Sequence, residues 1–255
     1  MQPVFLGHFY WYGVMLALAF LAGIIWTYQT FRWNNLNPDS VLDMAILVIL
    51  SGLVGARAGF ILINLSYFII NPLHMMLLRI GFDPFSGIIF AGLALYWYFY
   101  RNKLPVWKMM DYIMPGIVLG YVITRLGAFM NGSSYGKVCN PEYIKWAVTF
   151  PYLDGIMINY PLPRHPTQLY EAILYLGVFI LLVSLNRHAK FHGETFWFSL
   201  IMFSGINFVM EFFREPSGVW IIHHFTPVQF LSLGVFIFAW ALLVQFQSKS
   251  SSWPE

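Results

Sequence analysis

The chain has 255 residues, of which 59% are hydrophobic, 20% are aromatic and only 10% are charged. Because soluble domains carry about 25% charged residues, this composition excludes a water-soluble fold. The formal net charge of +3 is spread over the loops instead of lying in basic runs, so the sequence excludes nucleic acid as a partner.

Apolar stretches long enough to cross a bilayer recur along the whole chain. A membrane helix needs about 20 mainly apolar residues, and seven such helices make the fold class all-α, a polytopic integral membrane protein. No polar tract is long enough to fold separately, so residues 1–246 are expected to form a single membrane-embedded domain, followed by a short polar tail at 247–255. The predicted spans are 9–28, 43–64, 84–100, 109–131, 167–186, 194–213 and 225–246.

Three shorter segments have expectations of their own. The N-terminus lacks the basic region and cleavage site of a signal peptide, so the first apolar stretch is expected to remain as a helix. Residues 71–82 are too few to span the bilayer and are expected to lie in the interface or to re-enter the membrane. The glycines of GARAG at 55–59 have small-xxx-small spacing, and close helix packing is their favoured interpretation.

The basic residues of the short loops predict the orientation of the chain. Cytoplasmic loops carry an excess of Lys and Arg, and the connections after the third and fifth predicted spans are both basic. The N-terminus and the long connection 132–166 are therefore expected outside, and the C-terminus in the cytoplasm. The basic residues on the cytoplasmic side are Arg101, Lys103, Lys108, Arg187, Lys190 and Lys249.

Ionisable side chains within or at the ends of the spans are candidate site residues, because burying each one costs on the order of a few kcal/mol. Two interpretations stay open. These side chains can form ion pairs that stabilise the bundle or can reach the interface, or they can form a functional site. The spacing of three residues places Glu211 and Arg214 on the same helical face. The five residues are Arg57, Arg125, Glu171, Glu211 and Arg214.

The surroundings of Arg57 and Arg125 favour the functional interpretation. Gly, Asn and Ser lie around both arginines, in GARAGF and RLGAFMNGSSYG, which indicates a polar cavity. Guanidinium groups bind phosphate in a planar, often bidentate way. Arginines that outnumber the carboxylates near one membrane face therefore predict a site for a lipid phosphate.

The string HPTQLYE, residues 165–171, is the most distinctive in the chain. Pro166 can occupy the first turn of a helix, which then places Gln168 and Glu171 on one side, a turn apart. Glu171 or His165 can act as a base or hydrogen-bond anchor. The alternative is an interfacial histidine followed by a polar helix start.

No metal site is predicted. Cys139 is the only cysteine, which excludes an internal disulfide and a multi-thiolate site. His223 and His224 occupy adjacent positions that point apart, and no carboxylate is suitably spaced to join them.

Several motifs together resemble the bacterial prolipoprotein diacylglyceryl transferases, seven-helix enzymes of the cytoplasmic membrane. The resemblance covers most of the chain, with the motifs in the same order. They are WYG at 11–13, GARAGFILIN at 55–64, RLGAFMNGSSYGK at 125–137, HPTQLYE at 165–171, EFFREP at 211–216 and, in the seventh helix, Gln229.

The resemblance implies transfer of the diacylglyceryl group of phosphatidylglycerol to the lipobox cysteine thiol of a prolipoprotein signal peptide. The products would be a thioether and glycerol phosphate, and no metal or organic cofactor is implied. Membrane lipid and prolipoprotein are then the partners, in the bacterial inner membrane. The implied catalytic residues are Glu171, His165 and Arg214, and the implied substrate-binding residues are Arg125, Arg57, Asn131, Gly136, Tyr12, Gln168 and Tyr170.

The sequence departs from the family pattern at four positions. Phe85 and Ser86 stand where the family usually has His or Tyr and a glycine, Ala128 stands for an Asn, and Ser133 stands for a Glu. These changes remove groups that could handle protons and leave the general base open between Glu171 and His165. A diverged relative that transfers lipid to another acceptor, or a lipid-binding protein without catalysis, is the alternative.

Overall fold

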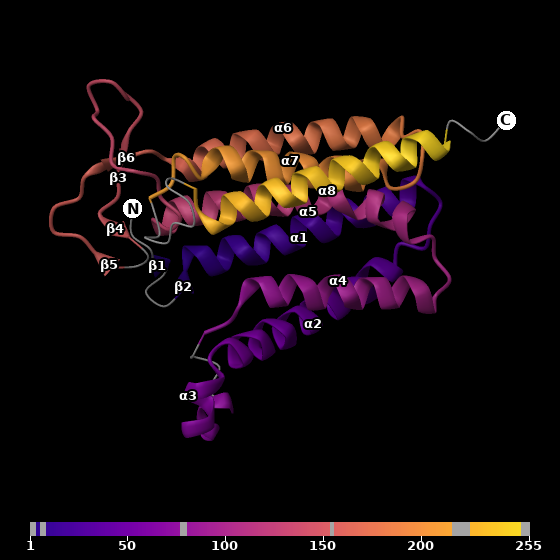
Figure 1. Cartoon of the computed structure of the whole chain (residues 1–255), viewed down its shortest axis with the longest axis horizontal. Coiled ribbons are helices and arrows are strands. Elements are labelled where there is room, and N and C mark those ends of the chain that lie inside the picture. Colours follow the sequence, from indigo (N-terminus) through magenta and orange to yellow (C-terminus); the bar gives the residue numbers. More distant parts are fainter. Residues whose placement is uncertain (1–3, 6–8, 77–80, 154–155, 216–224, 251–255) are drawn as a thin grey trace. The chain divides into compact units, whose positions relative to one another are not determined.

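Long helices dominate the computed structural model (Figure 1), which describes residues 4–5, 9–76, 81–153, 156–215 and 225–250. The chain forms two compact units, residues 1–27 with 110–255, and residues 28–109. The helices are α1 Trp11–Trp33, α2 Ser40–Ile63, α3 Leu65–Ile70, η1 Pro72–Met76 (a 3-10 helix), α4 Pro84–Arg101, α5 Val106–Asn131, α6 Thr167–Arg187, α7 Glu194–Met210 and α8 Pro227–Ser250. The strands are β1 Val4–Phe5, β2 Phe9–Tyr10, β3 Val148–Thr149, β4 Tyr152–Leu153, β5 Ile156–Met157 and β6 Pro163–Arg164.

Within the described part of the chain, five helices are long and apolar enough to cross a membrane, namely α1, α2, α5, α6 and α8. The predicted all-α membrane fold is therefore confirmed. A helix makes up most of each of the seven predicted spans, but the count of seven spans is not confirmed, since α4 falls outside that group and α7 has only 17 residues. The sixth predicted span, 194–213, extends beyond α7, because this helix ends at Met210 and a turn follows it.

The first unit is built around α5 and α6. Val118 and Val122 of α5 pack against Tyr175, Val178 and Leu182 of α6 in a buried cluster. A second buried cluster joins α7 to α8 through Trp197, Ile201 and Ala239. Apolar contacts between neighbouring helices thus fix the part of the chain that bears most of the predicted site.

A buried carboxylate attaches the start of α7 to α5. The Asp111 side chain accepts hydrogen bonds from the backbone N–H groups of Gly193 at 2.6 Å and Phe196 at 2.8 Å. The first N–H groups of a helix have no partner within it, so Asp111 supplies the acceptors from a neighbouring helix. These hydrogen bonds fix the position of the start of α7 along the axis of α5.

The connection between α5 and α6 contains the short strands. β3 pairs antiparallel with β6, with Val148 opposite Arg164, and β4 pairs with β5. Figure 1 shows this connection at the end of the bundle where α6 begins. The α8 helix reaches Ser250, within the polar tail expected from residue 247, and residues 251–255 lie outside the described part.

In the second unit, α2 packs closely along α4. A Cβ atom added to Gly55 would fall on the Phe90 side chain, and one added to Gly59 would fall on the Ser86 hydroxyl. That hydroxyl and the Ser86 N–H both donate to the Asp83 carboxylate at the start of α4. The packing interpretation of the GARAG glycines is therefore confirmed.

The described residues of the segment 71–82 contain little regular structure. It contains the 3-10 helix η1, and residues 77–80 lie outside the described residues. Its location in the membrane interface stays a prediction.

Substitution Gly59→Ala should lower the thermal unfolding midpoint, because the added methyl group would overlap the Ser86 hydroxyl. Overpacking of this kind costs about 1–3 kcal/mol. The matched control is Gly92→Ala in α4, where no atom lies within 4 Å of the added Cβ. Unfolding of the detergent-solubilised protein followed by tryptophan fluorescence would compare them, and equal midpoints would contradict the packing role of Gly59.

Candidate active site

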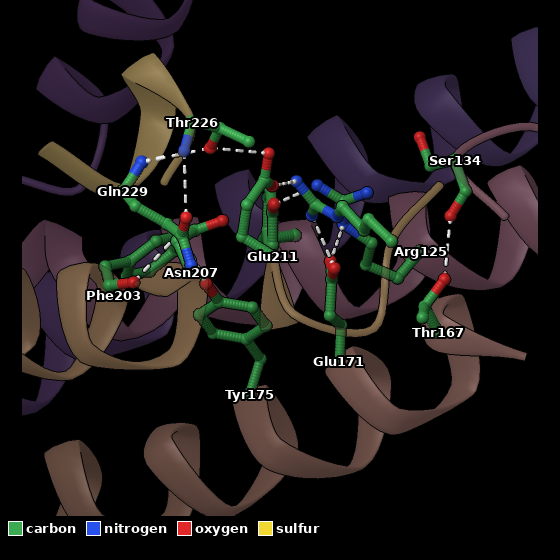
Figure 2. A network of polar contacts seen from close by, with 12 residues as sticks. Arg125, Ser134, Thr167, Glu171, Tyr175, Phe203, Asn207, Glu211, Thr226 and Gln229 are labelled. Carbon is green, nitrogen blue, oxygen red and sulfur yellow. Dashed lines mark hydrogen bonds and ion pairs between the residues drawn. The ribbon is translucent and has the colours of Figure 1, made fainter. Parts of the chain in front are cut away.

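A buried glutamate lies between two arginines in the first unit. Glu171 of α6 is 1% exposed, and its Oε2 lies 2.7 Å from Nε of Arg125 in α5. Its Oε1 accepts from Nη2 of Arg214, which follows α7 (Figure 2). The structure thus brings together three predicted site residues from three separate motifs.

The cluster extends on both sides of Glu171. Arg214 Nη1 lies 3.5 Å from Glu211 Oε2, and Glu211 Oε1 accepts from the Thr226 hydroxyl at 2.9 Å. On the other side, Arg125 donates to the Tyr121 hydroxyl, and its guanidinium lies 4.6 Å from the centre of that ring. In Figure 2 dashed lines join Thr226 to Glu211, and Arg125 lies beside Glu171.

The formal charges of this cluster cancel. Two arginines face two glutamates, so the predicted excess of arginine over carboxylate depends on Arg57, which belongs to the second unit. The sequence showed four charged groups near one face but not how they pair. A phosphate that binds here must exchange with, or add to, contacts that already exist.

The start of α6 holds the loop that follows α5. The Thr167 hydroxyl donates to the Ser134 carbonyl at 2.9 Å, and Gln168 Nε2 donates to the Ser133 carbonyl at 2.8 Å. Both donors are fully buried. The motifs RLGAFMNGSSYG and HPTQLYE therefore form one structure, and Gln168 acts by fixing a loop.

Gly136 allows three chain segments to meet. Its N–H donates to the His165 carbonyl at 3.1 Å, and it pairs with Arg214 on its other side. An added Cβ would lie 2.6 Å from the His165 Cβ and 2.8 Å from the Phe213 carbonyl oxygen. The pairing continues as Lys137 N–H donates to the Phe213 carbonyl at 2.8 Å. This backbone pairing explains why Arg214 lies outside α7.

A cavity of about 560 Å³ opens beside the cluster. Three of the predicted substrate-binding residues, Tyr12, Arg125 and Asn131, line it, together with Ala128 and Ser133, the two departures from the family signature. Hydroxyl groups, an amide and one guanidinium are suited to a phosphate with attached hydroxyls. The complete lining consists of Tyr12, Tyr121, Thr124, Arg125, Ala128, Asn131, Ser133 and Ser134.

His165 and Tyr170 form a second group that is not part of this lining. His165 Nδ1 lies 3.3 Å from the Tyr170 hydroxyl, which accepts from Trp146 Nε1 at 2.7 Å. The ring of His165 also packs edge-on against Phe213. Burial raises the pKa of the Cys139 thiol.

Arg57 belongs to the second unit. Its Nη1 donates to the Gly81 carbonyl at 3.0 Å, and its Nη2 donates to the carbonyls of His74 and Met75 at 2.9 and 3.0 Å. These contacts make Arg57 a structural residue that holds the chain between α2 and α4. Its role in lipid binding stays a prediction.

Sequence reasoning missed Tyr121 and Thr226 as members of the cluster. Tyr121 precedes Arg125 by four residues, a spacing that places both on one helical face. Thr226 precedes Gln229 by three, the spacing of a helix capping box. These two spacings could have identified Tyr121 and Thr226 from the sequence.

Among the residues that the structure describes, no group of three or more His, Cys, Asp or Glu side chains is placed to hold a metal ion. His223 and His224 lie outside the described residues.

A polytopic helical membrane protein with a partly exposed arginine in the wall of a polar cavity is suited to bind the head group of an anionic lipid. Sequence comparison gives the particular family. The family model described as "Prolipoprotein diacylglyceryl transferase" matches residues 4–245. The chain belongs to this family, as the resemblance of its motifs implied.

Three relatives from different bacteria agree with this assignment. Each of them is named phosphatidylglycerol--prolipoprotein diacylglyceryl transferase. The relative from Geobacter sulfurreducens is 35% identical, with 85% of this chain and 84% of the relative covered. The one from Photobacterium profundum is 33% identical, with 94% and 89% covered. The one from Clostridium tetani is 30% identical, with 93% and 97% covered.

Substitution Glu171→Gln should strongly destabilise the protein, because it removes the carboxylate that faces Arg125 and leaves Arg214 with the looser partner Glu211 at 3.5 Å, a loss of about 3–5 kcal/mol. The control is Glu215→Gln. Glu215 also pairs with an arginine, Arg164 at 2.5 Å, but its side chain is 44% exposed, so its loss should cost less than about 1 kcal/mol. Thermal unfolding in detergent checks both, and similar shifts in midpoint would contradict the central role of Glu171.

Proposed function

We propose that this protein transfers the diacylglyceryl group of phosphatidylglycerol to the thiol of the lipobox cysteine of a prolipoprotein. The sulfur forms a bond to the diacylglyceryl carbon, the carbon–oxygen bond to phosphate breaks, and glycerol phosphate leaves with the electron pair. The thiol proton passes to a base. The observation that supports this most strongly is the cavity beside Arg125, in a chain whose relatives are named for this reaction.

Arg125 would bind the phosphate and stabilise the charge that develops on the leaving group. Its guanidinium lines the cavity while its Nε stays on Glu171 and its ring contact stays on Tyr121. The side chain is therefore held in place before substrate arrives, which is the condition under which an electrostatic contact lowers a barrier. Asn131 and Tyr12 in the same wall would bind the glycerol hydroxyls or ester oxygens.

Glu171 serves better as a positioning residue than as the base. Both of its oxygens already contact guanidinium groups, and it is 1% exposed. His165 would then accept the thiol proton at Nε2, in the tautomer whose Nδ1–H donates to the Tyr170 hydroxyl and so orients the ring. The thiolate is the competent sulfur nucleophile.

The setting of the reaction is a bacterial cytoplasmic membrane. We place the N-terminus and the connection 132–166 outside and the C-terminus in the cytoplasm, on the basis of the basic short loops. The signal peptide of the prolipoprotein would then present its cysteine at the outer end of the helices. One membrane-embedded domain with a short polar tail fits this arrangement.

A second candidate function is transfer of the same lipid group to another acceptor. The observation that favours it is the presence of Ala128 and Ser133 in the cavity wall, at positions where the family usually has Asn and Glu. Incubation of the purified protein with phosphatidylglycerol and a lipobox peptide separates the two candidates. A peptide heavier by one diacylglyceryl group supports the first, and a peptide with serine in place of cysteine must remain unmodified.

Substitution Arg125→Lys should reduce transfer by about 100-fold or more, because an ammonium cannot replace the planar guanidinium contact with phosphate. The control is Arg187→Lys at the exposed end of α6, which should leave transfer unchanged. Initial rates with the lipobox peptide measure the effect. Equal rates for the two variants would refute the assignment of Arg125 to the phosphate.

A further inference from the structure

The start of α8 is a capping box with both partners buried. Thr226 N–H donates to Gln229 Oε1 at 2.9 Å, and Gln229 N–H donates to Thr226 Oγ1 at 3.4 Å. The two side chains belong to residues that are 4% and 2% exposed. Reciprocal contacts of this kind fix the first turn of a helix, so the Thr226 hydroxyl has a defined position.

This hydroxyl also reaches the cluster of charged residues. A threonine hydroxyl has one proton to donate, and here that proton goes to Glu211 Oε1 at 2.9 Å. The other oxygen of Glu211 lies 3.5 Å from Arg214 Nη1. Figure 2 shows Thr226 and Gln229 on one side of Glu211 and Arg125 on the other. A contact path therefore runs from the helix cap to Arg214.

Arg214 depends on such contacts because it is not part of a helix. It follows the turn after α7, and its side chain is 21% exposed. One carboxylate, Glu171, holds its Nη2 and is itself held by Arg125. The second carboxylate, Glu211, is held by Thr226. Without that second restraint the guanidinium can rotate about its contact with Glu171.

We propose that Thr226 and Gln229 are positioning residues that orient Arg214 through Glu211, so that its guanidinium faces an anionic lipid phosphate. The inference rests on the proposed function for the identity of that lipid. It assigns to the cap of α8 a role in substrate binding in addition to its role in helix stability. The two roles make different predictions for pairs of substitutions.

Binding of a short-chain phosphatidylglycerol to the full chain in detergent is the primary measurement. Thr226→Val keeps the shape of the side chain but loses the hydroxyl, and it should weaken binding about tenfold, the size expected for a hydrogen bond to a charged group. Thr226→Ser should restore binding. The matched control is Thr195→Val, a fully buried threonine at the other end of α7, which should bind as the wild type does.

A double-mutant cycle with Glu211→Gln separates positioning from helix capping. If Thr226 acts through Glu211, the double variant should bind no more weakly than Glu211→Gln alone. Additive losses, or equal binding by Thr226→Val and Thr195→Val, would overturn the inference. Should Thr226→Val fail to fold, Thr226→Asp retains a strong helix cap but cannot donate to Glu211, and wild-type affinity in that variant would also overturn it.

Transfer to the lipobox peptide, measured on the same samples, tests the proposed function separately. A non-additive cycle in binding without any peptide modification would support the positioning role and reject the transferase. Peptide modification with an additive cycle would support the transferase and reject the positioning role. Absence of phosphatidylglycerol binding by the wild type would overturn both.

Discussion

The contact of Glu171 with two guanidinium groups is the constraint on which the rest of the site depends. A carboxylate in a membrane protein core is tolerated only when its charge is compensated. Here one arginine comes from α5 and the other from the chain after α7, so the pairing ties α6 to two segments remote in sequence, one of them 43 residues away. The same contacts that make the burial tolerable fix the two side chains proposed to bind phosphate.

Backbone pairing outside the helices completes this arrangement. Gly136 lies between the His165 and Arg214 segments, where a side chain would collide with both. Side chains at the start of α6 donate hydrogen bonds to the backbone carbonyls of Ser133 and Ser134. Cavity-lining residues on a loop are therefore placed by buried donors on a helix, which gives the loop the rigidity that binding sites need.

The helices and the charged candidate residues could be predicted from the sequence for a physical reason. Apolar length and the cost of burying Arg57, Arg125 and Glu171 are local properties, visible in one stretch of chain. Which partner each charged side chain contacts depends instead on segments that are remote in the sequence. Nothing in the sequence indicated that Arg57 donates to three backbone carbonyls while Arg125 contacts Glu171, since both arginines lie in glycine-rich surroundings. The end of α7 was missed because backbone pairing with Lys137 overrides the apolar pattern of FVMEFF.

The neutral charge of the cluster bears on how catalysis would work. The phosphodiester of phosphatidylglycerol carries one negative charge, whereas the departing phosphomonoester approaches two near neutral pH, with a second pKa of about 6. Arg125 and Arg214 are already balanced by Glu171 and Glu211, so their attraction for the first charge is moderate. As the carbon–oxygen bond breaks, the growing charge on the phosphate competes more strongly than the carboxylates for the same N–H groups. A balanced cluster thus stabilises the transition state more than the bound substrate, and only such a difference accelerates a reaction.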